Sequence, residues 1–295
     1  MNTINKIQNT NHCIDLLAAQ RIRYSEAKKY RTIRIAGSFG LTIIAPLVIL
    51  LLPELKITLG IVGGIWTIVA FLLSARESNM VKEAATIQEE FDTQTFDLEW
   101  NNIQSGAKVS NEIIHSSASK YTDKTDLHDW YGDLEGINNN LSILICQRSN
   151  LVWDWRLRKQ FAWTITIALL LLFGLGLRIS LYLKLSLQTY LIGILLPATS
   201  AFILGVKEVK EHFDSAKSKE GLEKKINSIW ENSMTTLVSP TKSELRQVQD
   251  KIYHLRTNTA LIPDWCYSKL KGEFEKNMQN TIDRYRNEAR NKNIR

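Results

Sequence analysis

The apolar residues of the chain gather in four segments that are nearly free of charge. They cover residues 35–52, 57–75, 161–177 and 187–206. Each segment approaches the roughly 20 residues that an α-helix needs to cross about 30 Å of hydrocarbon. The buried core helix of a soluble protein could explain one of them, but four such segments flanked by charged clusters favour membrane helices. The sequence therefore predicts four spans, arranged as two helical hairpins with short connectors.

Basic residues lie on the same side of every predicted span. The flanks before the first and third spans and after the second and fourth hold Arg21, Arg23, Lys28, Lys29, Arg31, Arg34, Arg76, Lys82, Arg148, Arg156, Arg158, Lys159, Lys207, Lys210, Lys217 and Lys219. The two connectors hold only Lys56 in the first and Arg178 with Lys184 in the second. Because the cytoplasmic flanks of membrane proteins are rich in Lys and Arg, we expect both termini and the middle of the chain to lie in the cytoplasm.

The polar stretches between the spans predict helices on the cytoplasmic side. Residues 1–34 are expected to form an amphipathic helix, 35–75 the first hairpin, 76–160 a cytoplasmic helical segment, 161–206 the second hairpin and 207–295 the C-terminal helices. A helix is expected to start at Leu134 and run into the third span, and another to start at Ser239-Pro240. The predicted fold is an all-α membrane protein with helical cytoplasmic stalks and a small cytoplasmic α-helical domain.

The net charge of +7 fits this arrangement. Basic residues beside spans are held by anionic lipid headgroups, so the expected partner is the lipid bilayer and nucleic-acid binding is not expected. The three cysteines, Cys13, Cys146 and Cys266, are far apart in the sequence and on the predicted cytoplasmic side. Disulfides, a metal site and a cofactor are therefore not expected.

The chain lacks the sequence motifs of common enzymes. It contains no phosphate-binding glycine loop, no nucleophile elbow and no metalloprotease helix motif. The adjacent Glu89 and Glu90 lie among lysines on a predicted helix, where a solvated face explains them better than acid–base catalysis. The sequence predicts that the protein is not an enzyme.

Charged residues are absent from the centres of the predicted spans. This argues against a pump or an ion-coupled carrier, because such proteins place charges within the membrane. The candidate pore-lining residues are the hydroxyl side chains Thr42, Ser74, Thr164, Thr166, Thr199 and Ser200. The alternative, and the commoner fate of such hydroxyls, is a bond back to their own helix. Four helices are too few to enclose a wide pore, so a channel would need several copies.

The middle cytoplasmic segment is unusually rich in aromatic, amide and arginine side chains. Its candidate ligand-binding or gating residues are Gln88, Asp92, Trp100, Asn101, Trp130, Tyr131, Gln147, Arg148, Asn150 and Asp154. Aromatic rings that stack and amides that bond base edges are what a nucleotide pocket needs. The alternative is an aromatic seam where helices pack, with Trp rings at the membrane surface, and the residues alone favour this alternative.

Several of these motifs resemble a known family. They are Gln20-Arg21, residues 88–101, Trp130-Tyr131, residues 146–150 with Trp153-Asp154, and residues 262–265 with Tyr267. Together with the hairpin layout, the chain resembles the SMODS-associated four-transmembrane (S-4TM) pore-forming effectors over nearly its whole length. The resemblance implies a role in bacterial anti-phage defence, beside a synthase that makes a cyclic oligonucleotide, and permeabilisation of the inner membrane.

Three functions remain open at this point. The first is a homo-oligomeric pore-forming effector in the bacterial inner membrane, activated by a cyclic oligonucleotide. The second is a membrane-anchored scaffold or signalling partner that forms no pore. The third is a small passive transporter, which would move a solute without an activating nucleotide.

Overall fold

The computed structural model describes residues 3–292 and 294, except for the side chains of residues 46–47, 49–50, 193–194, 197–198, 200 and 267–278. The elements are α1 (Thr3–Ile7), α2 (Asn11–Leu51), the 3₁₀ turn η1 (Pro53–Leu55), α3 (Lys56–Phe96), α4 (Asn102–Ser105), α5 (Asn111–Ala118), the 3₁₀ turn η2 (Thr125–Leu127), α6 (Asn139–Tyr182), α7 (Leu187–Tyr190), the π-helical turn η3 (Leu191–Leu195), α8 (Leu196–Thr236), α9 (Lys242–Thr257) and α10 (Asp264–Asn291). The described residues form helices and loops and no strand, which confirms the all-α prediction.

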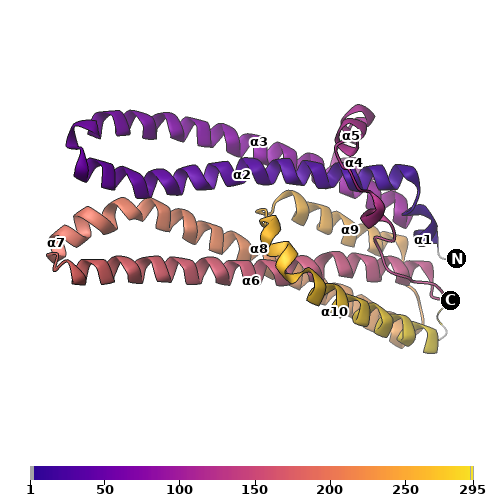
Figure 1. Ribbon diagram of the computed structural model, residues 1–295. Coiled ribbons are helices and arrows are strands. Elements are labelled where there is room, and N and C mark those ends of the chain that lie inside the picture. Colours follow the sequence, from indigo (N-terminus) through magenta and orange to yellow (C-terminus); the bar gives the residue numbers. More distant parts are fainter. Residues whose placement is uncertain (1–2, 293, 295) are drawn as a thin grey trace.

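Two long helical hairpins dominate the molecule. Helices α2 and α3 form the first and α6 and α8 the second, and the two lie side by side with their turns at one end (Figure 1). Both termini lie at the opposite end, where α9, α10 and the short helices α4 and α5 pack on the hairpins (Figure 1). Helices α2, α3 and α6 continue without a break between the turns and this second half, whereas α8 follows α7 and the π-helical turn η3.

The half that holds the turns exposes its apolar side chains. Among the described residues, two helical stretches, Pro53–Phe96 and Asn139–Tyr182, are long and apolar enough to cross a membrane. In their most apolar 18-residue windows, 0% and 6% of the residues are buried within the protein. The core helix of a soluble protein would be mostly buried, so lipid is the environment that fits these surfaces. The second and third predicted spans thus have the length and composition of membrane helices; the first and fourth spans and the topology stay predictions.

The hydrophobic core lies at the end opposite the turns. Its largest fully buried side chains include Leu16 and Leu17 of α2, Phe91 of α3, Leu141 of α6 and Phe96 at the end of α3. Burying one such side chain stabilises the fold by about 1.5–3 kcal/mol. Because this core joins α2, α3 and α6, it fixes the two hairpins to a single domain.

Two helices begin later than the sequence predicts. Helix α9 begins after Thr241, not at Ser239-Pro240, because Thr241 accepts from the Glu244 backbone N–H while the Glu244 side chain accepts from that of Thr241, a capping box. Helix α6 begins at Asn139, not at Leu134. The intervening Gly136 has φ of +84°, a left-handed conformation that favours glycine and interrupts a helix.

A close approach inside the first hairpin gives a testable prediction. A Cβ at Gly37 would lie 2.0 Å from the ring of Trp66, whose Nε1 donates to Ser38 Oγ (3.1 Å). Gly37→Ala should therefore destabilise the hairpin by about 1–3 kcal/mol, because the indole or the helices must shift. Thermal unfolding of the detergent-solubilised protein measures this. The control is Gly40→Ala, since nothing lies within 4 Å of a Cβ there; equal melting temperatures for the two variants would contradict the prediction.

Candidate functional site

Two buried carboxylates on α3 are bound by side chains of α9. Glu89 and Asp92 lie almost one turn apart, and neither is exposed to solvent. Gln249 Nε2 donates to Glu89 Oε2 (2.8 Å) and to Asp92 Oδ2 (3.0 Å). Arg256 pairs with Asp92 (2.6 Å) and Arg246 with Glu89 (2.5 Å). Buried charges are stable only when they are paired and hydrogen-bonded, so these contacts are what allow α9 to pack on α3.

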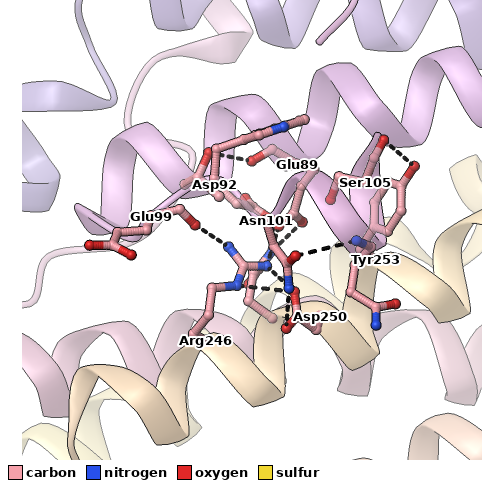
Figure 2. Close-up of polar contacts among 12 residues, drawn as sticks. Glu89, Asp92, Glu99, Asn101, Ser105, Arg246, Asp250 and Tyr253 are labelled. Carbon is pink, nitrogen blue, oxygen red and sulfur yellow. Dashed lines mark hydrogen bonds and ion pairs between the residues drawn. The ribbon is translucent and has the colours of Figure 1, made fainter. Parts of the chain in front are cut away.

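The guanidinium group of Arg246 lies among polar groups of α3, of α9 and of the loop after α3 (Figure 2). Besides Glu89 it pairs with Asp250 on its own helix (2.9 Å) and donates to the carbonyl of Glu99 (3.1 Å). Asn101 adds a bond from its Nδ2 to Asp250 Oδ2 (3.0 Å). The same Asn101 caps α4, because its Oδ1 accepts from two backbone N–H groups. The contacts fix the loop after α3 against α9.

The cluster also reaches the second hairpin through Asp92. Tyr131 Oη donates to Asp92 Oδ1 (2.6 Å) and accepts from Asn150 Nδ2 of α6 (2.9 Å). Gln147 of α6 donates from Nε2 to Gln249 Oε1 (3.2 Å). Because α3 belongs to the first hairpin and α6 to the second, this buried network connects the two. We call the residues Glu89, Asp92, Tyr131, Gln147, Asn150, Arg246, Gln249 and Arg256 the inter-hairpin network.

Burial shifts the ionisation of several network groups. Burial and the neighbouring charge of Asp92 raise the pKa of Glu89 to about 7. Burial and Asp92 likewise raise the pKa of Tyr131 well above its usual range, so its hydroxyl stays a hydrogen-bond donor. Burial alone would lower the pKa of Arg256, but Asp92 outweighs it and raises that pKa, so the guanidinium stays charged. The Arg256–Asp92 pair is the ionic centre of the network.

Three other predicted site residues make separate contacts. Gln88 Oε1 accepts from Tyr24 Oη of α2 (3.4 Å). Trp100 donates from Nε1 to a backbone carbonyl six residues further along (2.9 Å). The ring of Trp130 lies 5.2 Å from the guanidinium carbon of Arg21, a cation–π distance. Each of these side chains fixes a loop or a helix pair outside the network.

Arg148 and Asp154 lie on α6 and face α8. Arg148 pairs with Glu223 (2.5 Å) and donates from Nε to Asn227 Oδ1 (2.8 Å). Asp154 pairs with Arg158 one turn further along α6 (2.8 Å) and with Lys219 of α8. These contacts hold the two helices of the second hairpin together between its apolar part and the end of the molecule that holds the termini. Of the ten predicted ligand-binding or gating residues, four belong to the inter-hairpin network: Asp92, Tyr131 and Asn150 are joined by direct hydrogen bonds, and Gln147 is joined to Asp92 through Gln249.

Sequence reasoning missed four members of the network. The expectation that Glu89 and Glu90 lie on a solvated face is wrong, because Glu89 is fully buried beneath α9 and Glu90 is only 6% exposed. Arg246, Gln249 and Arg256 were not singled out at all. The spacing could have indicated them. Glu89 and Asp92 are three residues apart on one predicted helix, and Arg246 and Gln249 are three apart on another. Residues three apart share a face of a helix.

A second ionic cluster joins the hairpins closer to their apolar halves. Arg31 of α2 pairs with Glu77 of α3 (2.8 Å) and with Glu208 of α8. Arg34, almost one turn further along α2, pairs with Glu77 (2.9 Å). The side chains of Arg31, Glu77 and Glu208 are each exposed by 10% or less. Arg31 is therefore a buried bridge between the first hairpin and the second.

Comparison with known proteins decides the family. Residues 2–285 match the family described as SMODS-associating 4TM effector domain. The chain belongs to this family of effectors. A "probable CBASS effector molecule" of Bacillus cereus (strain VD146) is 30% identical over 268 residues, which cover 88% of this chain and 90% of that relative. No solved structure matches the chain.

The family assignment confirms the resemblance seen in the sequence, and this family consists of four-transmembrane effectors rather than catalytic domains. The motifs that indicated the family have structural contacts. Arg21 pairs with Asp126 (2.6 Å), and Ile262 packs with Leu157 and Phe161 of α6. Tyr267 of the last motif lies outside the described side chains. The motifs thus fasten loops and the start of α10 to the long helices.

Four of the six candidate pore-lining hydroxyls are bonded to backbone carbonyls one turn earlier in the chain. Thr42, Thr164, Thr166 and Thr199 each donate to the carbonyl four residues earlier, at 2.8–3.0 Å. This is the pattern that the helix-internal alternative describes. Ser74 is exposed, and the side chain of Ser200 lies outside the described residues. A hydroxyl bonded in this way can still have its oxygen at the surface of the helix, so the pore-lining role stays a prediction.

The described residues hold no group of three or more His, Cys, Asp or Glu side chains that could bind a metal ion. Cys13 and Cys146 are buried thiols. Burial raises the pKa of Cys13, and burial together with Asp92 raises that of Cys146 well above its usual range. Both thiols stay protonated at neutral pH and are poor nucleophiles.

Proposed function

We propose that the protein is a pore-forming effector of a bacterial anti-phage defence system that is signalled by a cyclic oligonucleotide. The observation that carries the proposal is the division of the molecule into two halves. One half consists of two hairpins whose apolar side chains face outward, and the other is a packed domain whose buried polar network joins both hairpins. The similarity to a probable CBASS effector supports the defence role.

The proposed topology has four spans in the inner membrane with both termini in the cytoplasm. The placement of both termini at the end opposite the hairpin turns supports it (Figure 1). The basic flanks of the predicted spans also lie toward that end, as the excess of Lys and Arg on the cytoplasmic side requires. In this arrangement the domain that contains the inter-hairpin network lies in the cytoplasm, on the same side of the membrane as a soluble signal.

Several copies must assemble to form the proposed pore. One chain contributes four spans, which cannot surround a wide aqueous channel. The outward apolar faces of the hairpins are available to lipid or to a second copy, and the hydroxyls of Thr42, Ser74, Thr164, Thr166 and Thr199 are the candidate lining groups. Assembly would turn part of these surfaces away from lipid.

Activation requires the signal to bind the open assembly more tightly than the closed one. A change from 1:99 to 99:1 needs about 5.5 kcal/mol of differential affinity, which several linked protomers can share. The inter-hairpin network, with Arg148, Trp100 and Asn101 beside it, is the proposed place where binding alters the relation of the two hairpins. A cyclic oligonucleotide made by a partner synthase is the proposed signal.

Membrane potential in bacteria that express the protein tests this function. We expect rapid depolarisation when an active cyclic-oligonucleotide synthase is co-expressed, and none with a catalytically dead synthase. Arg148→Gln should abolish the depolarisation without preventing membrane insertion, because it removes the contacts with Glu223 and Asn227. Arg156→Gln is the matched control, since Arg156 is exposed on the same helix.

The alternative outcome is equally informative. If the inserted protein leaves the membrane potential intact while the messenger is being made, the pore is excluded. A scaffold that acts through a protein partner would then explain the effector role. Equal depolarisation by wild type and Arg148→Gln would exclude the proposed part played by Arg148.

A further inference from the structure

Two buried cations share one carboxylate where the second hairpin enters the cytoplasmic domain. Arg158 of α6 pairs through Nε with Asp154 Oδ2 (2.8 Å), and Lys219 of α8 pairs with the same oxygen. The side chains of Arg158 and Lys219 are only 7% and 6% exposed. Removing two cations from water costs several kcal/mol for each, and one carboxylate offsets only part of that cost. When Lys219 is protonated, the group has one positive charge in excess.

A buried histidine beside this group has a free donor. His212 of α8 is fully buried and packs edge-on against Phe161, with ring centroids 4.9 Å apart. Burial, with Arg158 and Arg31 nearby, lowers the pKa of His212 to about 3, so the ring is neutral. Its Nδ1 lies 3.4 Å from Arg158 Nη1 and accepts, which leaves the proton on Nε2. Among the described residues, Nε2 has no hydrogen-bond partner.

Arg256 adds a further unpartnered donor. Its Nη1 pairs with Asp92, whereas its buried Nη2 has no partner within the described part of the chain. The charge of Arg256 reaches Lys219: burial and Arg256 together lower the pKa of Lys219 to about 7. Buried donors without partners are rare in native proteins, and each one calls for an explanation such as a bound ion.

We propose that Arg158, Lys219 and His212, with Arg256 beside them, bind a phosphate group. A phosphate supplies the missing negative charge and several acceptor oxygens for Lys219 Nζ, the Arg158 guanidinium and His212 Nε2–H. Arg and Lys are the side chains that proteins use most for this purpose, and a neutral His adds a directional hydrogen bond. Phosphate binding would also favour the charged form of Lys219.

The site lies on the second hairpin, at the ends of the two predicted spans that lead into the cytoplasmic domain. Arg158 lies three residues before Phe161, where the predicted third span begins, and His212 follows the predicted fourth span. Arg158 Nη1 also donates to the carbonyl of Ala260 (2.5 Å), in the linker between α9 and α10. The phosphate can belong to a lipid headgroup at the membrane surface or to a soluble nucleotide. The inference goes beyond the proposed function, because binding here does not depend on pore formation.

Inorganic phosphate is the probe for the first experiment. The full-length protein in neutral detergent is unfolded thermally while phosphate replaces chloride at constant ionic strength. We expect a saturable rise of several degrees in the melting temperature, because a ligand that binds only the folded state stabilises it. No rise, or a rise that does not saturate, would overturn the proposal.

Lys219→Met separates phosphate binding from a structural role. This variant leaves Arg158 and Asp154 as a balanced pair, so its melting temperature without phosphate should equal or exceed that of the wild type, and its response to phosphate should vanish. Lys219→Gln is used if the Met variant does not fold. Lys217→Met is the control, because Lys217 is exposed two residues away. A full phosphate response in folded Lys219→Met or Lys219→Gln would refute the site.

Lipid composition distinguishes the two sources of phosphate. The titration is repeated in nanodiscs of phosphatidylcholine alone and of phosphatidylcholine with phosphatidylglycerol. If the anionic headgroup occupies the site, phosphatidylglycerol should raise the melting temperature of the wild type but not of Lys219→Met, and the response to added phosphate should disappear. If the phosphate comes from a soluble nucleotide, the response should persist in both lipids. Depolarisation is measured separately, so this proposal and the proposed pore can fail independently.

Discussion

Replacing Asp92 by Asn should lower the free energy of unfolding by about 3–5 kcal/mol, the usual cost of leaving one member of a buried ion pair without its partner. Asp92 is fully buried and accepts from Arg256, Gln249 and Tyr131. The substitution keeps the size of the side chain but leaves the Arg256 guanidinium buried without its paired charge. Urea unfolding of the detergent-solubilised protein, followed by tryptophan fluorescence, measures the change.

Two further variants make this result specific. Asp97→Asn removes a carboxylate that is 82% exposed and pairs with Lys242 (3.2 Å), so it should change the free energy of unfolding by at most about 1 kcal/mol. The double variant Asp92→Asn with Arg256→Gln removes both buried charges and should recover part of the loss. If Asp92→Asn and Asp97→Asn had the same effect, the ion pair would not be the centre of the network.

Replacing Arg31 by Met should depolarise the membrane without any messenger. Arg31 joins Glu77 of the first hairpin to Glu208 of the second. Its loss leaves Glu77 paired with Arg34 alone and removes the charge that pairs with the buried Glu208, so the attraction that holds the two hairpins together at this point is lost. If half or more of the roughly 3–5 kcal/mol cost of breaking a buried pair favours the open state, its population rises at least about tenfold. Membrane potential in cells that lack a synthase is the measurement.

Arg34→Met is the matched control for this experiment. Arg34 lies on the same helix and pairs with the same Glu77 (2.9 Å), but both residues belong to the first hairpin. Its loss should leave the closed state largely intact. An inserted Arg31→Met protein that remains silent without the messenger, or equal leakage by both variants, would show that the Arg31 bridge does not hold the closed state.

The hairpins could be predicted from sequence because their signal is local. Four uncharged segments with short connectors allow few other arrangements. The structure has α2, α3 and α6 where the first three segments lie, and α7, η3 and the start of α8 where the fourth lies. The turn of the second hairpin also has a local cause, because Lys184 in the predicted connector adopts a left-handed conformation with φ of 50°. Helix starts were predicted less well, because Gly136 and the Thr241 cap act through single backbone bonds that hydropathy does not report.

The polar networks could not be predicted because they depend on tertiary packing. Asp92 and Arg256 are 164 residues apart in the chain, and Arg31 and Glu208 are 177 apart. A charged residue on an amphipathic helix has the same local pattern whether it faces water or another helix. Glu89 illustrates this: its neighbours indicate a solvated face, and only the position of α9 shows that it is buried.

The unbroken helices have a mechanical consequence. Helix α3 has 41 residues and includes both the buried carboxylates and the predicted second span, so at 1.5 Å per residue it is about 60 Å long. A rotation of about 5° at the cytoplasmic end of such a rod would displace its far end by about 5 Å. A small local rearrangement around Asp92 would therefore cause its largest displacement at the far end of α3, on the side of the membrane away from the signal.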